Sequence, residues 1–154
     1  MTTRFRRILL VEDDANDVEL TMTALSDHAI ANQVDVVRDG AEALEYLLCT
    51  GQYATRTTGP PAVVLLDIKL PKVDGREVLR QIRSNTELRL IPVVMLTSSR
   101  EERDLFESYR LGANAFVVKP VDFTSFVDAM RQVGAFWAVV NEPPPGQTLR
   151  FDQG

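Results

Sequence analysis

The sequence predicts an α/β fold, a doubly wound five-stranded parallel sheet with helices on both faces. Two observations support this prediction. Short apolar runs alternate along the chain with segments of helical periodicity, which is the pattern of βαβ units. The run 62–67 is apolar up to its last residue, as expected of a strand that is covered on both faces.

Five short apolar runs are predicted to form the strands. They are rich in Val, Ile and Leu, and polar or turn-forming residues separate them from the segments that follow. In chain order, the predicted strands cover residues 7–12, 33–38, 62–67, 92–96 and 115–118.

A segment with apolar residues at helical spacing follows each strand. In the first of these segments Val18, Met22 and Leu25 share one face. The fourth segment stops at Gly112, a residue that commonly follows the end of a helix. In chain order, the predicted helices cover residues 16–27, 39–48, 75–83, 101–111 and 122–137.

Two regions do not fit this alternation. Residues 50–61 form a long connection rich in Gly, Pro and Thr, and connections of this length often carry function. A surface that recognises a partner and a tolerated insertion are equally compatible with it. Residues 141–154 contain Pro143-Pro144-Pro145, which cannot form a regular helix. We therefore expect one domain over residues 1–140, a proline-containing tail over residues 141–154, and no second domain.

Length and charge exclude several classes of protein. The chain has 154 residues and a net charge of −5, whereas a nucleic-acid-binding domain would be expected to carry a basic patch. A single cysteine argues against a disulfide framework and a cysteine metal site. No apolar stretch approaches the roughly 20 residues that span a membrane, or the roughly 7–15 of a secretory signal. We expect a cytoplasmic protein with no nucleic-acid or membrane partner.

Chemically active residues follow four of the predicted strands. Glu12 and Asp13 follow the first strand, Asp67 ends the third, Thr97 follows the fourth and Lys119 follows the fifth. Parallel strands bring their carboxyl ends to one edge of the sheet, where open α/β folds bind their ligands. We therefore expect these carboxylates, the hydroxyl and the ammonium to meet in one crevice.

These residues suit phosphoryl chemistry that depends on Mg²⁺. Crowded carboxylates repel one another and attract a cation, and oxygen ligands favour Mg²⁺. Asp67 is placed to attack phosphorus as a nucleophile, with Glu12 and Asp13 as ligands on the metal side. Lys119 and the Thr97 hydroxyl would stabilise the charge on the phosphoryl oxygens.

The motifs closely resemble those of the receiver domain of two-component response regulators, over roughly residues 6–138. They are Leu10-Val11-Glu12-Asp13-Asp14, Leu66-Asp67-Ile68-Lys69-Leu70-Pro71 with Asp74-Gly75, Leu96-Thr97-Ser98 and Lys119-Pro120. Thr97 lies 30 residues after Asp67, and Lys119 lies 22 residues after Thr97, which is the spacing of the chemotaxis receiver. The resemblance implies a flavodoxin-like receiver fold and a signalling protein that catalyses only its own phosphorylation and dephosphorylation.

The resemblance also implies a role for each matching residue. Asp67 would accept a phosphoryl group from a sensor histidine kinase. Glu12, Asp13 and Asp67 would hold Mg²⁺ together with the backbone carbonyl of Lys69. Thr97 and Phe116 would form the switch pair, and Lys119 would contact the phosphoryl oxygens. The bond before Pro120 is often cis in this family, and a cis bond is expected here.

Where the sequence differs from compact receivers, it resembles one subfamily of response regulators. Asp67 lies 54 residues after Asp13, about ten more than in compact receivers, and the excess falls in residues 50–61. This insertion, Asp17 and the proline-bearing tail are similar to single-domain regulators paired with cyanobacterial and bacterial phytochromes. That similarity implies a phytochrome as the partner kinase, and a homodimer through the fourth helix, fifth strand and fifth helix.

Other functions fit the sequence less well. A phosphatase of the haloacid dehalogenase type uses an Asp nucleophile, but it needs a second Asp where this chain has Lys69. A flavodoxin-type binding module would need a glycine-rich phosphate loop after the first strand, where acids stand instead. A receiver that acts as a scaffold without phosphorylation is a further alternative, although every expected site residue is present.

Overall fold

The computed structural model describes residues 7–26, 33–98, 102–120, 122–137 and 141. Its centre is a five-stranded sheet with the order β2-β1-β3-β4-β5, in which every neighbouring pair is parallel. The strands are β1 (Ile8–Val11), β2 (Val34–Val37), β3 (Val63–Asp67), β4 (Val93–Thr97) and β5 (Ala115–Val118). The sheet confirms the predicted number of strands and their parallel direction.

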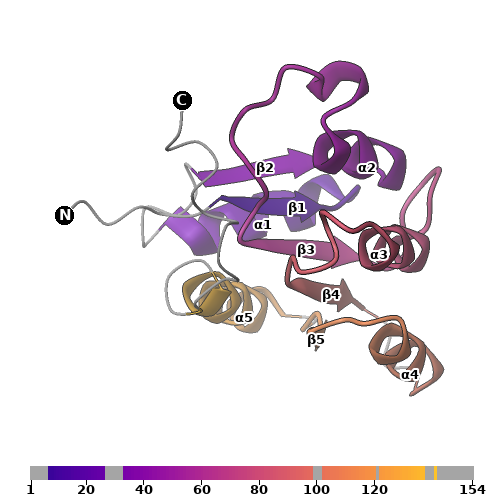
Figure 1. Ribbon diagram of the computed structural model, residues 1–154. Helices are drawn as coiled ribbons and strands as arrows, with labels where there is room; N and C mark the ends of the chain where they lie inside the picture. The colour runs from indigo at the N-terminus through magenta and orange to yellow at the C-terminus, as the bar shows by residue number, and fades with distance from the viewer. Residues whose placement is uncertain (1–6, 27–32, 99–101, 121, 138–140, 142–154) are drawn as a thin grey trace.

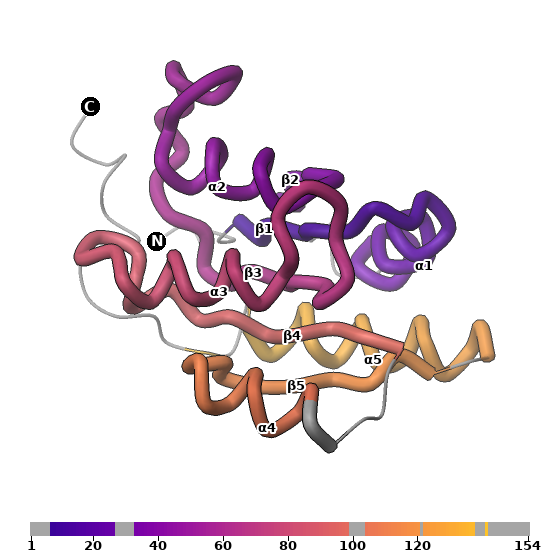
Figure 2. Tube along the Cα trace, turned by 90° about the vertical axis from the view of Figure 1, so that its right-hand side faces the viewer, coloured from indigo at the N-terminus to yellow at the C-terminus, as the bar shows by residue number. Residues whose placement is uncertain are grey.

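Helices cover both faces of the sheet, which confirms the doubly wound α/β prediction (Figure 1, Figure 2). α2 and α3 pack on one face, and α1 and α5 pack on the other. The helices are α1 (Ala15–Ser26), α2 (Gly40–Leu48), η2 (Gly51–Tyr53), α3 (Gly75–Ser84), α4 (Glu102–Arg110) and α5 (Phe123–Ala135). In the described part of the chain, no helix is both long and apolar enough to cross a membrane.

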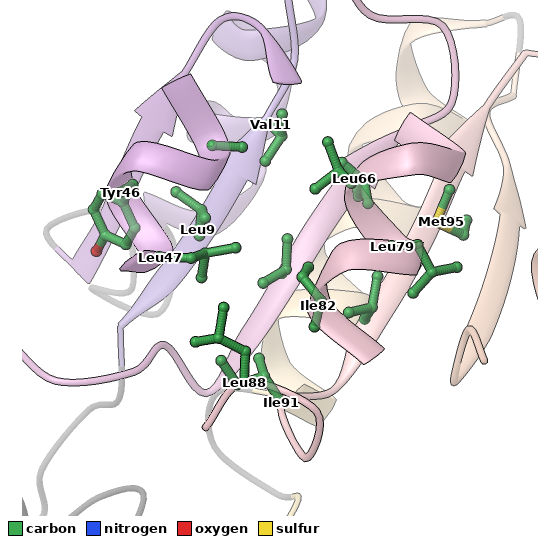
Figure 3. Packing of buried hydrophobic residues seen from close by; sticks show 14 of the residues in the cluster. Leu9, Val11, Tyr46, Leu47, Leu66, Leu79, Ile82, Leu88, Ile91 and Met95 are labelled. Carbon is green, nitrogen blue, oxygen red and sulfur yellow. The ribbon is translucent and has the colours of Figure 1, made fainter. Parts of the chain in front are cut away.

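Each face of the sheet carries its own apolar cluster. Along β1, Ile8 and Leu10 point toward α1 and α5, whereas Leu9 and Val11 point toward α2 and α3. Figure 3 shows the cluster between the sheet and helices α2 and α3, in which these helices place leucine and isoleucine side chains over β1, β3 and β4. The three central strands are fully buried, as the absence of polar alternation in residues 62–67 predicted.

Gly75 allows α3 to begin directly above the end of β3. A Cβ atom at this position would lie 2.1 Å from the backbone oxygen of Asp67, which is closer than atoms can approach. Asp74 caps the helix by accepting a hydrogen bond from the backbone N–H of Arg76 at 2.8 Å. Glycine at position 75 therefore keeps α3 close to the carboxyl end of the central strand.

The connection over residues 50–61 is more ordered than its composition suggested. It contains η2, and the ring of Tyr53 packs edge-on against Tyr46 of α2, with 5.1 Å between the ring centroids. The Arg56 guanidinium lies 4.2 Å from the centre of the Tyr46 ring and donates to the Tyr46 backbone oxygen at 2.9 Å. A cation–π contact and hydrogen bonds thus dock the insertion on α2.

Arg83, in the last turn of α3, joins the helix to the segments around β4. Its guanidinium is half-buried and donates to four oxygen atoms. The acceptors are the backbone oxygens of Gly112 at 2.8 Å, Arg89 at 3.1 Å and Ile91 at 2.8 Å, and Oδ1 of Asn114 at 2.7 Å. Only the planar fork of an arginine can reach acceptors spread over this range of directions.

Replacing Arg83 by lysine should therefore destabilise the fold by about 1–3 kcal/mol, because an ammonium group cannot serve all four acceptors. Urea unfolding would measure the loss. The matched control is Arg80→Lys on the same helix, where the exposed pair with Glu77 should contribute less than about 0.5 kcal/mol. Equal stabilities for the two variants would contradict the role assigned to Arg83.

Candidate functional site

The strand register brings the predicted site residues to one edge of the sheet. Val11 of β1 pairs with Leu66 of β3, so Glu12 and Asp67 follow at the same level. On the other side, Asp67 pairs with Leu96, the residue before Thr97. The backbone N–H of Lys119 donates to the Thr97 oxygen at 2.7 Å, which places the lysine one residue beyond β5.

The Lys119 ammonium lies at the centre of this group. Its Nζ atom donates to Oδ2 of Asp67 at 3.2 Å and to Oδ2 of Asp17 at 2.9 Å, and it is in still closer contact with Oε1 of Glu12. Glu12 is 2% exposed and Lys119 is 8% exposed. The predicted convergence of the acids and the lysine is therefore present in the structure.

Burial and neighbouring charges shift the pKa values of Glu12 and Lys119, the closest pair in the site. Burial raises the pKa of Glu12 to about 7 in spite of the Lys119 hydrogen bond, and Asp67 adds to the rise. Burial alone would lower the pKa of Lys119, but the hydrogen bond and charge of Glu12, with Asp67 and Asp17, outweigh it and raise the pKa above its usual value. The lysine stays charged, and the acids around it attract a proton or a metal.

Three carboxylates form a group that could hold a metal ion. One oxygen each of Glu12, Asp13 and Asp67 lies within 4.8 Å of the others. Asp13 is exposed, and Oδ1 of Asp67 faces the backbone N–H of Lys69 at 3.3 Å. With Asp17, the site contains four acids and the Lys119 ammonium, so negative charge is in excess. An all-oxygen group with excess negative charge fits a hard divalent cation such as Mg²⁺.

The loop after β1 is held by its own capping interactions. The backbone N–H of Asp17 donates to Oδ1 of Asp14 at 3.0 Å, and the N–H of Val18 donates to the Asp14 backbone oxygen at 3.0 Å. Asp14 is therefore the N-cap of α1, which leaves Asp13 without a structural role in the cap. Among the three acids after β1, Asp14 thus provides the cap, and the carboxylates of Glu12 and Asp13 take part in the site.

Asp17 is a site residue that motif reasoning did not include. In the sequence Asp17 stands out only as a subfamily feature, whereas in the structure its carboxylate contacts the Lys119 ammonium. The sequence does contain a signal for this role. Asp17 is an acid in the first turn of the helix that follows Glu12, and from there its side chain can point back toward the strand ends. Its partner on a segment 102 residues away could not be inferred from that spacing.

The two expected switch residues lie on neighbouring strands. Thr97 ends β4 and is 2% exposed. Phe116 is on β5, is half-buried, and packs against the cluster under α2 and α3. The expected cis bond before Pro120 is absent: the bond between Lys119 and Pro120 is trans, the isomer that X–Pro bonds favour by about 0.5–1 kcal/mol.

The chain belongs to the response regulator receiver domain family, whose sequence profile matches residues 8–131. Members of this family are signalling domains that interact with sensor histidine kinases. The fold, the five motifs and the acidic group at the strand ends agree with this membership.

Three of the relatives are response regulators, and two of them are named as phytochrome response regulators. Response regulator Rcp1 of Synechocystis sp. (strain ATCC 27184 / PCC 6803 / Kazusa) is 38% identical over 84% of this chain and 87% of its own length. Its Mn²⁺-bound crystal structure superimposes with a TM-score of 0.83, at 36% identity over 90% of this chain and 99% of that one.

The other two relatives are solved structures. The phosphorylated cyanobacterial phytochrome response regulator RcpA has a TM-score of 0.86, at 38% identity over 92% of this chain and 99% of that one. The bacteriophytochrome response regulator AtBRR is 61% identical over 91% of this chain and all of that one, with a TM-score of 0.71. This chain is therefore a receiver domain that is similar to phytochrome response regulators, and the phosphatase and flavodoxin alternatives are not supported.

The raised pKa of Glu12 predicts how the stability of the metal-free protein depends on pH. In the unfolded chain, Glu12 should titrate near about 4.3, and in the folded protein its pKa is about 7. Between these values the folded state binds more protons, so stability should fall as pH rises through this window, by on the order of 2 kcal/mol.

Urea unfolding between pH 5 and pH 8 in a chelating buffer would measure this fall. Glu12→Gln should flatten the profile, because an amide does not titrate. Glu87→Gln, at an exposed position, should leave it unchanged. A wild-type profile that rises or stays level over the window would show that Glu12 does not hold the proton.

Proposed function

We propose that this protein is a single-domain response regulator that accepts a phosphoryl group on Asp67 from the phosphohistidine of a sensor histidine kinase. The observation that carries the proposal is the contact of a buried ammonium, Lys119, with the carboxylate at the end of the central strand. Membership of the receiver family supports the same assignment. The protein is proposed to catalyse only its own phosphorylation and dephosphorylation.

In the proposed reaction, a carboxylate oxygen of Asp67 attacks phosphorus. The bond from phosphorus to the imidazole nitrogen of the donor breaks, and its electron pair stays on that nitrogen. The Lys119 ammonium donates a hydrogen bond to a phosphoryl oxygen and so offsets the charge that develops there. Among the three acids that contact Lys119, Asp67 is the proposed nucleophile because it ends the central strand β3 and has the longest hydrogen bond to the ammonium.

Mg²⁺ is the proposed cofactor. Glu12, Asp13 and Asp67 would hold it, with the backbone carbonyl of Lys69 as a further oxygen ligand. When bound, the ion neutralises charge shared between Asp67 and the phosphoryl oxygens. The Mn²⁺-bound form of the relative Rcp1 supports a divalent ion in a site of this kind.

Thr97 and Phe116 are proposed to transmit the phosphorylation. The Thr97 hydroxyl would move toward the phosphoryl group, and the half-buried Phe116 ring would turn inward into the space that this movement opens. β5 is the edge strand beside α4, and Phe106 and Tyr109 of α4 are exposed. The face formed by α4, β5 and α5 is therefore the proposed homodimer interface and the output surface.

The proposed partner kinase is a bacterial phytochrome, since the relatives RcpA and AtBRR are phytochrome response regulators. Residues 1–140 are proposed as the receiver domain, and residues 141–154 as a proline-containing tail. The insertion docked on α2 is a feature that the partner could recognise. We propose that the protein acts in the cytoplasm, without nucleic-acid or membrane contacts.

Asp67→Asn should abolish phosphorylation and leave the fold intact, because an amide is not a nucleophile toward phosphorus. Intact mass after incubation with acetyl phosphate and Mg²⁺ would detect one added phosphoryl group in the wild type and none in the variant. Asp128→Asn, an exposed position on α5, is the matched control and should label normally. Labelling of Asp67→Asn would refute the site, and an unlabelled wild type would favour a scaffold receiver.

Thr97→Val should separate phosphorylation from the response. The variant keeps the shape of the side chain but lacks the hydroxyl that would contact the phosphoryl group. We expect labelling within roughly threefold of the wild type, and much smaller changes in the amide resonances of α4 and β5 on phosphorylation. If the variant showed the same resonance changes as the wild type, Thr97 would not be part of the switch.

A further inference from the structure

Asp17 differs from the other acids around Lys119 in its position and in its contacts. It lies in the first turn of α1, whereas Glu12 and Asp67 lie at strand ends. Its carboxylate is 2.9 Å from the Lys119 ammonium, which is closer than the 3.2 Å from that ammonium to Asp67. The lysine is thus drawn toward Glu12 and α1 and contacts the proposed phosphoryl acceptor through its longest hydrogen bond.

The number of donors on Lys119 makes this preference important. An ammonium group has three N–H donors, and Glu12, Asp17 and Asp67 accept one bond each. A phosphoryl oxygen can receive a bond only if one carboxylate releases the ammonium. The longest of the three bonds is the one to Asp67, the residue that would carry the phosphoryl group, so the exchange should occur there.

We propose that Asp17 is a positioning residue, which together with Glu12 holds the Lys119 ammonium on the α1 side of the site and keeps Asp67 available to the metal and the phosphoryl donor. This inference rests on the proposed function of Asp67. Asp17 acts through Lys119 and does not touch the reacting atoms.

Loss of the Asp17 carboxylate would leave a buried N–H of Lys119 without its charged acceptor. Such a donor is costly, and the ammonium can recover an interaction by moving closer to Asp67. A tighter pair would neutralise the Asp67 carboxylate, making it a weaker nucleophile and a weaker metal ligand. Phosphorylation should therefore become slower even when Mg²⁺ is saturating.

A purely electrostatic role for Asp17 predicts the opposite result. If Asp17 contributed only negative charge, its removal would reduce the repulsion of an anionic phosphoryl donor and speed the reaction at saturating Mg²⁺. The sign of the rate change thus distinguishes positioning from charge. Glu19 is the matched control, since it is an exposed acid on the same helix two residues further along.

The experiment compares Asp17→Asn, Glu19→Gln and the wild type, labelled by acetyl phosphate at saturating Mg²⁺ and followed by intact mass. A small donor avoids any effect of α1 on kinase docking. We expect Asp17→Asn to be slower by roughly three- to tenfold, the effect of about one hydrogen bond, and Glu19→Gln to match the wild type. A rate for Asp17→Asn equal to or above that of Glu19→Gln would overturn the proposal.

A second measurement does not depend on phosphorylation. In the metal-free protein, the ¹⁵N resonance of the Lys119 ammonium should shift or broaden in Asp17→Asn and not in Glu19→Gln, because only the first substitution replaces a charged acceptor of this ammonium by a neutral one. An unchanged resonance would also overturn the proposal. If the wild type labels normally, either result leaves the proposed function standing; if the wild type does not label, the proposed function fails and the positioning role fails with it.

Discussion

The site depends on one constraint, which is the accommodation of several carboxylates around a single buried ammonium. Lys119 contacts Glu12, Asp17 and Asp67, which come from three different elements, at a sheet edge that solvent reaches only in part. Without this cation the acids would repel one another in a medium of low polarity. With it they still carry excess negative charge, and this excess is what makes the group suitable for a divalent ion and for phosphoryl chemistry.

The rest of the fold holds that group in place. Four strands end at the same level because they are parallel and in register, so each contributes its last residue or the one after it to the same crevice. Gly75 allows α3 to lie against the end of β3, and Arg83 secures the other end of that helix to the β4 region. The helices also bury both faces of the sheet with apolar side chains.

The receiver family accounts for the fold and the motifs of this chain, whereas two further contacts involve side chains outside those motifs. The docking of Arg56 on Tyr46 gives the insertion a defined conformation beside α2. Asp17 adds a third carboxylate to the lysine from the first turn of α1. The first contact joins the insertion to α2, and the second joins α1 to the site lysine. Arg56, Tyr46 and Asp17 all lie outside the five motifs.

The sequence by itself determined the fold class, the order of the elements and most of the site. Apolar runs alternating with helical segments specify parallel strands. The carboxyl ends of parallel strands lie at the same edge of the sheet, so Glu12, Asp67, Thr97 and Lys119 meet there. These predictions are local or topological, so they need no knowledge of side-chain packing. The ends of most elements also agree within one or two residues.

Only the tertiary structure decided which carboxylates share the ammonium and how the insertion folds. Asp17 and Lys119 are 102 residues apart, and their contact depends on the rotation of α1 against the sheet. Arg56 and Tyr46 are ten residues apart, and the connection after α2 brings the guanidinium over the ring. Such contacts depend on the relative placement of distant elements, which packing of the whole chain sets.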